Sequence, residues 1–269
     1  MKNDHKELLQ YNPEGSDLRK AQKIMLNILC EVAKICNRHK ISYWLSAGTL
    51  LGAVRHNGFI PWDDDIDIEV EQKDFKRLIR ILQNELPSNL LVQSEFNDVN
   101  YFHKFAKVRN INTLIHEEGS TQFENRGIFI DIFPRESSNL FFVKIYHLIM
   151  GNSFYKSRFK ESKMSLSSNF LINNSRILIA NSILVVNRLL NKVFKFKESY
   201  ALSFVKYYVG LNREQLYPLK NVIFEGESFN SPSDHDAYLK SYFGDYMTIP
   251  TPDKRIVHST KIEFFENIN

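Results

Sequence analysis

The chain has 269 residues, 43% apolar and 25% charged, which is the balance of a globular protein able to bury a substantial core. Its net charge is +4, but residues 140–200 hold ten Lys or Arg and two acids, so that block carries +8 and the remainder −4. This asymmetry indicates one face for an anionic partner, and we expect no nucleic acid among the partners.

The composition also argues against export and against metal sites built on cysteine. Cys30 and Cys36 lie six residues apart on a predicted helix, on different faces, so we expect two free thiols. No Cys/His set has zinc-finger spacing. The N-terminal residues lack the apolar core of a signal peptide, and no run of 18 apolar residues predicts a transmembrane helix. The expected location is the cytoplasm, with peripheral contact at the inner face of the cytoplasmic membrane as an alternative.

Helices and strands alternate in the first half of the chain. After a polar leader at 1–17, apolar spacing predicts a long helix from Leu18 to about His39, with Asp17 as its N-cap. The next predicted elements are a strand at 41–45, a short helix at 49–55, a strand at 65–70, a helix at 75–86 and strands at 90–93 and 101–108.

The strand at 65–70 carries the first candidate site. Apolar residues recur there at every second position, which places Asp65, Asp67 and Glu69 on the opposite face. Neighbouring carboxylates on that face stand about 6–7 Å apart and can converge on a hard cation such as Mg²⁺, with Mn²⁺ as an alternative. A solvated acidic turn is the simpler interpretation, but five acids at 63, 64, 65, 67 and 69 repel one another unless a cation offsets them. The pattern favours a metal–nucleotide site.

The preceding loop supplies candidates for binding phosphate. Gly48 and Thr49 follow a strand and precede a short helix, where backbone N–H groups form an anion-binding concavity. We expect Thr49 to cap that helix and donate to phosphate, and Arg55 to grip phosphate bidentately. An ordinary capped turn with a surface arginine is the alternative.

Two later strands add charged candidates. The run 127–133 is apolar on both faces except at Asp131, which predicts a central strand and a third acidic site residue. The alternative is that Asp131 pairs with a buried arginine or with backbone amides. Lys107 and Arg109 alternate on a predicted strand and therefore face the same side. Either one of them neutralises the diphosphate of a bound nucleotide, or both are surface cations.

The remainder of the chain is less informative. Residues 110–126 are polar and predict a loop, and residues 140–210 predict a helical basic insertion with helices at 140–150 and 177–196. That insertion either covers one side of the core, the interpretation we favour, or rests on anionic lipid. Beyond it we expect a hairpin at Glu225-Gly226, a helix to Phe243 and an extended tail in which Tyr246 and His258 lie near the ligand or simply pack.

The run from Ser46 to Ile68, SAGTLLGAVRHNGFIPWDDDIDI, resembles the signature of the LicD family, of which fukutin-related proteins are distant relatives. Further similar segments are FAKVR at 105–109, GIFIDIFP at 127–134 and YFGDYM at 242–247, and Ala47 stands where a second glycine is frequent. The resemblance implies a nucleotidyltransferase-like fold. It also implies transfer of phosphocholine, or a similar phospho-substituent, from a CDP-activated donor such as CDP-choline to a sugar of a cell-surface glycan (lipopolysaccharide or teichoic acid) or its lipid-linked precursor.

We therefore expect one mixed α/β domain over 1–269, with a nucleotidyltransferase-like core and the insertion at 140–210. Asp65, Asp67 and Asp131 would bind the metal and carry catalysis, and Gly48, Thr49, Arg55, Lys107 and Arg109 would hold the donor. Two alternatives remain: a true nucleotidyltransferase that releases pyrophosphate, and a non-catalytic calcium-binding protein, although no EF-hand loop is present.

Overall fold

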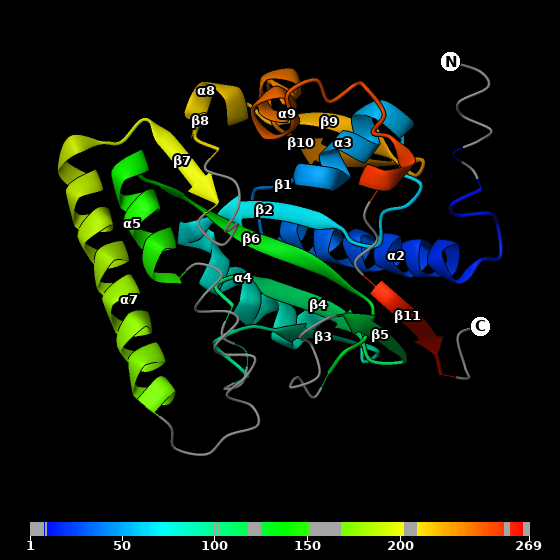
Figure 1. Ribbon diagram of the computed structural model, residues 1–269, viewed down its shortest axis with the longest axis horizontal. Coiled ribbons are helices and arrows are strands. Elements are labelled where there is room, and N and C mark those ends of the chain that lie inside the picture. Colours follow the sequence, from blue (N-terminus) through cyan, green and yellow to red (C-terminus); the bar gives the residue numbers. More distant parts are fainter. Residues whose placement is uncertain are drawn as a thin grey trace.

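A mixed β-sheet forms the centre of the protein in a computed structural model that describes residues 8, 10–98, 101, 103–117, 125–150, 168–201, 209–255 and 259–265. Within those residues the sheet has seven strands. Its main path runs through β1 (Tyr43–Leu45), β2 (Asp67–Glu71), β6 (Phe129–Ser137), β4 (Ala106–Asn110) and β3 (Leu90–Gln93). β2 and β6 are parallel and the other neighbours antiparallel, so the expected mixed α/β architecture is confirmed (Figure 1).

β6 is the central strand, as its two apolar faces predicted. Its first half pairs with β4 and β2, and its last residues pair with β7 (Glu198–Ala201), which in turn pairs with β8 (Leu211–Asn212). Ile68, Val108 and Ile132 belong to the main buried core, together with residues of several helices. Because side chains alternate along a strand, Asp67 and Asp131 project from the other face of the sheet.

Two helices, α2 (Asp17–Arg38) and α4 (Gln72–Glu85), each contact more than one strand of the sheet. α2 begins one residue earlier than predicted, because the side chain of Ser16, rather than Asp17, accepts the N-terminal capping hydrogen bond from Arg19 N–H. Cys36 on this helix is buried and Cys30 half-buried, and both are free thiols, as expected.

The C-terminal part folds back over the start of the chain. The predicted hairpin consists of β9 (Lys220–Phe224) and β10 (Glu227–Ser231), and both turn residues, Glu225 and Gly226, have positive φ. It is preceded by the short α8 (Arg213–Leu216) and followed by α9 (His235–Phe243) and a 3-10 turn, η1 (Pro252–Lys254).

One predicted loop is wrong in part. Residues Thr113–Glu117, within the stretch expected to be a loop, form β5, which pairs with β11 (Ser259–Phe264). The five residues of β5, TLIHE, are too short and too mixed to indicate a strand by spacing. The strand depends on its partner β11, which lies more than 140 residues away in the chain. The predicted strand from Tyr101 is also shorter, since β4 begins at Ala106.

Within the insertion, α5 (Leu140–Met150) and α7 (Ser168–Phe194) pack against each other around a small core that also holds Tyr101 and Tyr200, and they stand at one edge of the molecule (Figure 1). The insertion is not helical throughout, because Glu198–Ala201 form β7 of the main sheet. Our expectation that no helix spans a membrane stays a prediction, and one helix bears on it. Ser175–Phe194 has a mean hydropathy of 1.5 and is long and apolar enough to do so by length and composition.

Candidate active site

Two carboxylates face each other across β2 and β6. Asp67 and Asp131 are register partners on these parallel strands, and each is 7% exposed. The backbone around them is tied closely, since Asp131 N–H donates to the Ile66 carbonyl at 2.7 Å. Asp65 lies near enough to act electrostatically on Asp67. The structure therefore brings together the three acids that the sequence assigned to the metal.

These carboxylates crowd one another. Burial raises the pKa of Asp67 well above its ordinary value, and the charges of Asp65, Asp131 and Asp63 raise it further, while Lys107 opposes the shift. Burial and the neighbouring carboxylates Asp65 and Asp64 likewise raise the pKa of Asp63. A cation placed among these groups would relieve both the desolvation and the repulsion.

The N-terminus of α3 (Ala47–His56) lies against this acidic group. Ser46 N–H donates to the Asp67 carbonyl at 3.0 Å, and Asp67 N–H donates to the Thr49 hydroxyl at 2.8 Å. A Cβ on Gly48 would stand 3.0 Å from a carboxylate oxygen of Asp63, so a larger residue there would press on the acids. Gly48 and Thr49 thus lie where the sequence placed them, beside the metal residues.

Thr49 does not cap α3, contrary to our prediction. Ser46 occupies the N-cap position, and Thr49 lies in the first turn, where its hydroxyl holds the start of β2. The Ser46 side chain makes no capping hydrogen bond, and its hydroxyl is buried without a partner among the described residues. A buried hydroxyl at a helix N-terminus beside carboxylates is placed to donate to a phosphate oxygen.

Ser46 and Asp63 were not among the site residues predicted from the sequence. The available signal for Ser46 was its type, because serine directly before a helix is a preferred N-cap and its hydroxyl can hydrogen-bond. Asp63 was hidden within the acidic run 63–65, where spacing alone does not say which carboxylate turns inward.

Lys107 and Arg109 project from the same face of β4 but have different surroundings. The Lys107 ammonium lies 3.0 Å from an oxygen of Asp131 and 3.2 Å from the centre of the Phe129 ring. Arg109 is fully buried and donates to Gln93 at 2.8 Å and to the Gly127 carbonyl at 3.0 Å. Lys107 therefore belongs to the carboxylate group, whereas Arg109 joins β3, β4 and the start of β6.

Arg55 lies at the far end of α3. It donates to the Tyr246 carbonyl at 2.7 Å and interacts electrostatically with Asp63. These contacts fasten α3 to the C-terminal segment, and a phosphate-binding role for Arg55 stays a prediction. Tyr246 is buried and its hydroxyl donates to Asp236, so structural contacts explain this residue without a role at the ligand. His258 lies outside the described residues.

The oxygen ligands present suit a hard cation. Among the described residues, no three His, Cys, Asp or Glu side chains are arranged as a ready metal cluster. Mg²⁺ needs fewer protein ligands, because it is commonly held by one or two carboxylates with water and substrate phosphate completing the octahedron. Asp65 and Asp67, with Asp131 beside them and the Ser46 hydroxyl nearby, fit that requirement.

Glu69, the third acid of the β2 face, has a structural partner instead. Its carboxylate is fully buried and lies 2.7 Å from Nε of Arg135, a β6 residue two positions beyond the register partner of Glu69. Trp44, Tyr238 and Tyr242 also donate to it. Glu69 therefore connects β1, β2, β6 and α9, two residues along β2 from Asp67.

Comparisons with known proteins show which chains are similar to this one. Residues 40–171 match the model of the LicD/FKTN/FKRP nucleotidyltransferase domain. The lipopolysaccharide cholinephosphotransferase LicD of Haemophilus influenzae is 29% identical over 271 residues, an alignment that covers 90% of this chain and 95% of that protein. Human ribitol 5-phosphate transferase FKRP is 50% identical over 34 residues, which are 13% of this chain and 7% of the relative. Human ribitol-5-phosphate transferase FKTN is 29% identical over 97 residues, or 36% and 18%.

Proposed function

The chain belongs to the LicD family and is a LicD-type phosphotransferase, and from that premise we propose its donor, cofactor and acceptor. The enzyme moves phosphocholine, or a similar phospho-substituent, from a CDP-activated donor to a sugar hydroxyl of a cell-surface glycan or its lipid-linked precursor, with Mg²⁺ as cofactor. The observation that supports this most is the in-register pair Asp67 and Asp131 beside the N-terminus of α3.

Asp65 and Asp67 hold the metal in this proposal. Bound Mg²⁺ would supply positive charge against the donor's phosphates and the leaving CMP. Asp131 completes the metal shell or accepts the proton of the attacking hydroxyl, and its position beside Asp67 suits either role. The contact with Asp131 places the Lys107 ammonium within the carboxylate group, where its charge can act on the diphosphate as negative charge develops during transfer.

The N-terminus of α3 holds the donor phosphates. The Ser46 hydroxyl and the backbone N–H groups at Gly48 and Thr49 lie at the positive end of the helix, next to the carboxylates. Arg109 contributes by keeping β4 in place for Lys107, since its own donors already serve Gln93 and Gly127.

The enzyme works in the cytoplasm in this proposal, in peripheral contact with anionic membrane through α5 and α7. The outward face of α7 exposes Leu178, Ile179, Val185, Leu189 and Val193, each by 51% or more. That apolar face belongs to the block with a charge of +8. Exposed apolar side chains rimmed by cations are the features of a helix that rests on anionic lipid.

Product analysis tests the reaction. The protein is incubated with Mg²⁺, a cell-surface glycan preparation and either CDP-choline or CTP, and the released nucleotide and pyrophosphate are measured. We expect CMP from CDP-choline and transfer of choline phosphate to the glycan. Pyrophosphate from CTP without CMP from CDP-choline would instead indicate nucleotidyl transfer. Metal binding that prefers Ca²⁺, with no turnover of either nucleotide, would indicate a non-catalytic protein.

A further inference from the structure

A cavity lies farther along the same strands, and none of the carboxylate-site residues lines it. It has a volume of about 870 Å³, within the range of small-molecule sites, and we call it the basic pocket. Glu71 and Arg135, register partners at the ends of β2 and β6, line it. They follow Asp67 and Asp131 by four residues on each strand, which places the basic pocket roughly 13 Å from the carboxylates.

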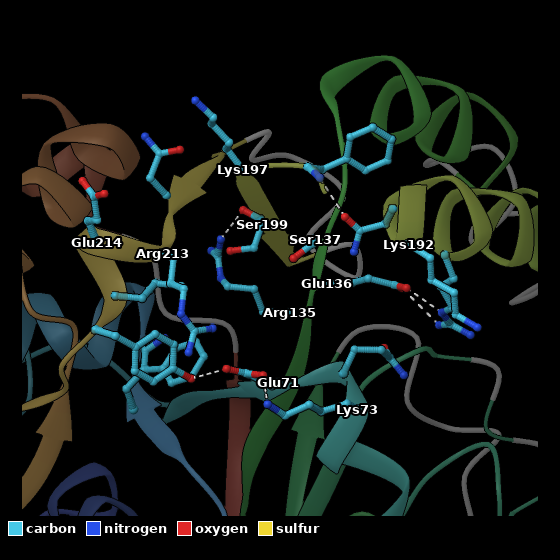
Figure 2. A pocket seen from close by; sticks show the side chains of 18 residues that line it. Glu71, Lys73, Arg135, Glu136, Ser137, Lys192, Lys197, Ser199, Arg213 and Glu214 are labelled. Atoms are coloured by element: carbon cyan, nitrogen blue, oxygen red, sulfur yellow. Dashed lines mark hydrogen bonds and ion pairs between the residues drawn. The ribbon is translucent and has the colours of Figure 1, made fainter. Parts of the chain in front are cut away.

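Cations outnumber acids in this cavity. Its lining includes six cationic side chains, Lys73, Arg135, Arg188, Lys192, Lys197 and Arg213, against the acids Glu71, Glu136 and Glu214. Figure 2 shows these groups arriving from several sides: from the end of β2, from β6, from α7 and its continuation, and from α8. An anionic ligand would therefore meet positive charge from more than one direction.

Part of this charge is already neutralised. Lys73 lies 2.6 Å from Glu71, Arg188 donates to Glu136, and Arg135 is held by the buried Glu69. Outside these ion pairs the lining has the cations Lys192, Lys197 and Arg213 and the acid Glu214. Arg213 lies 4.8 Å from the Tyr217 ring and acts electrostatically on Glu71. No carboxylate partner is present for Lys192 or Lys197 in the described part of the chain.

The rest of the lining suits a saccharide. Tyr217 and Phe196 offer aromatic surface, and Asn212 and Ser137 offer hydrogen-bonding groups. The helix that contributes Lys192 is also the one whose outward face is apolar, so one side of the pocket adjoins the proposed membrane contact.

We propose that the basic pocket is a second binding site, which holds a phosphate group of the acceptor saccharide on Lys192, Lys197 and Arg213. The identity of the ligand as acceptor rests on the proposed function, whereas the phosphate site itself rests on the cavity and its charges. The phosphate belongs either to a soluble glycan phosphate or to the headgroup of a lipid-linked one.

Lysine footprinting tests the site without using a nucleotide. The full chain is acetylated with and without inorganic phosphate, with sodium chloride at equal ionic strength as the reference, and each lysine is quantified by mass spectrometry. We expect phosphate to slow acetylation of Lys192 and Lys197 several-fold. Lys195, which lies between them in the sequence, and Lys220 do not line the pocket and should react at unchanged rates. Equal rates at all four lysines, or equal slowing of all four, would overturn the proposal.

Two further arms identify the source of the phosphate. Glycerol phosphate is compared with phosphatidylglycerol vesicles, with Lys220 as the reference in both. Stronger protection of Lys192 and Lys197 by vesicles assigns a lipid headgroup, and stronger protection by glycerol phosphate assigns a soluble ligand; protection by neither contradicts the site.

Kinetics then separates the pocket from the proposed function. In the Lys192→Gln/Lys197→Gln variant, KM for the glycan acceptor should rise at least about tenfold, because two charge-assisted contacts are lost. kcat and KM for CDP-choline should be unchanged. The Lys220→Gln/Lys254→Gln variant removes the same charge from exposed positions and controls for net charge. Footprints at Lys192 and Lys197 in a protein that does not turn over CDP-choline would leave the pocket standing and remove the proposed function. Turnover of CDP-choline, with an acceptor KM that is unchanged in the Lys192→Gln/Lys197→Gln variant, would remove the pocket and leave the proposed function standing.

Discussion

At the residue scale, Ala47 has a strained backbone in the loop beside the candidate active site. Its φ of 42° lies in the left-handed region, which costs a residue with a Cβ about 1 kcal/mol or more. The position directly follows Ser46 and precedes Gly48, so the strained residue turns the chain from β1 into the helix whose N-terminus faces the carboxylates. This explains why a second glycine suits the position: glycine adopts positive φ without strain.

Replacing Ala47 by glycine should therefore stabilise the protein. We expect Ala47→Gly to raise the free energy of unfolding by up to about 1 kcal/mol, measured as a higher urea midpoint at constant m-value. The matched control is Ala53→Gly in the same helix, where ordinary helical backbone predicts a loss of about 1 kcal/mol or more. A loss of stability in both variants would show that the strain at Ala47 is not relieved by glycine.

At the scale of elements, the strands of the site are held by the buried ion pair between Glu69 and Arg135. The two residues lie on neighbouring strands, and their side chains are 0% and 1% exposed. Arg135 also donates to the Ser199 carbonyl of β7 and to the Tyr242 hydroxyl of α9. This network connects the carboxylate site to the basic pocket, because Arg135 lines the second and lies on the strand that carries Asp131.

Breaking this pair should be costly. Arg135→Met leaves the Glu69 carboxylate buried without its cation, and we expect a loss of about 3–5 kcal/mol of stability by urea unfolding. The double variant Arg135→Met/Glu69→Leu should be more stable than the single one, because no charge is then left unpaired. Lys34→Met, which removes the exposed ion pair with Glu31, is the control and should shift the midpoint little. A small effect of Arg135→Met would mean that Trp44 and the two tyrosines suffice to hold Glu69.

The outward face of α7 is the other element whose role can be measured. We expect Leu189→Ser/Val193→Ser to weaken binding to phosphatidylglycerol vesicles about tenfold or more in a sedimentation assay, since these side chains are 56% and 72% exposed and would enter the lipid. Ile223→Ser/Met247→Ser removes exposed apolar side chains from other elements and should leave binding unchanged. Equal vesicle binding by the wild type and both double variants would argue against membrane contact through α7.

At the scale of the whole molecule, the sequence predicted what is local and missed what depends on distant pairing. The sequence predicted that four residues lie together, namely Asp65, Asp67, Gly48 and Thr49, because they belong to one short stretch whose spacing fixes their faces. Asp131 was found because a lone carboxylate interrupts an apolar strand.

Other features needed the fold. The pairing of β5 with β11 and the partnership of Glu69 with Arg135 join segments far apart in the chain, so no spacing rule reveals them. The buried state of Arg109 and the apolar outward face of α7 depend on which neighbours cover each element, information that a periodic pattern does not contain.

The most direct test of this account is a calorimetric titration of CDP-choline, CDP-ribitol and CTP into the protein, with and without Mg²⁺. We predict that one CDP-linked donor binds only when Mg²⁺ is present, and that Asp67→Asn, which keeps the shape of the side chain, abolishes this binding in a folded protein. Asp253→Asn, an exposed position in η1, should bind as the wild type does. Donor binding that is independent of Mg²⁺, or that persists in folded Asp67→Asn, would contradict the metal–nucleotide site at the centre of the account.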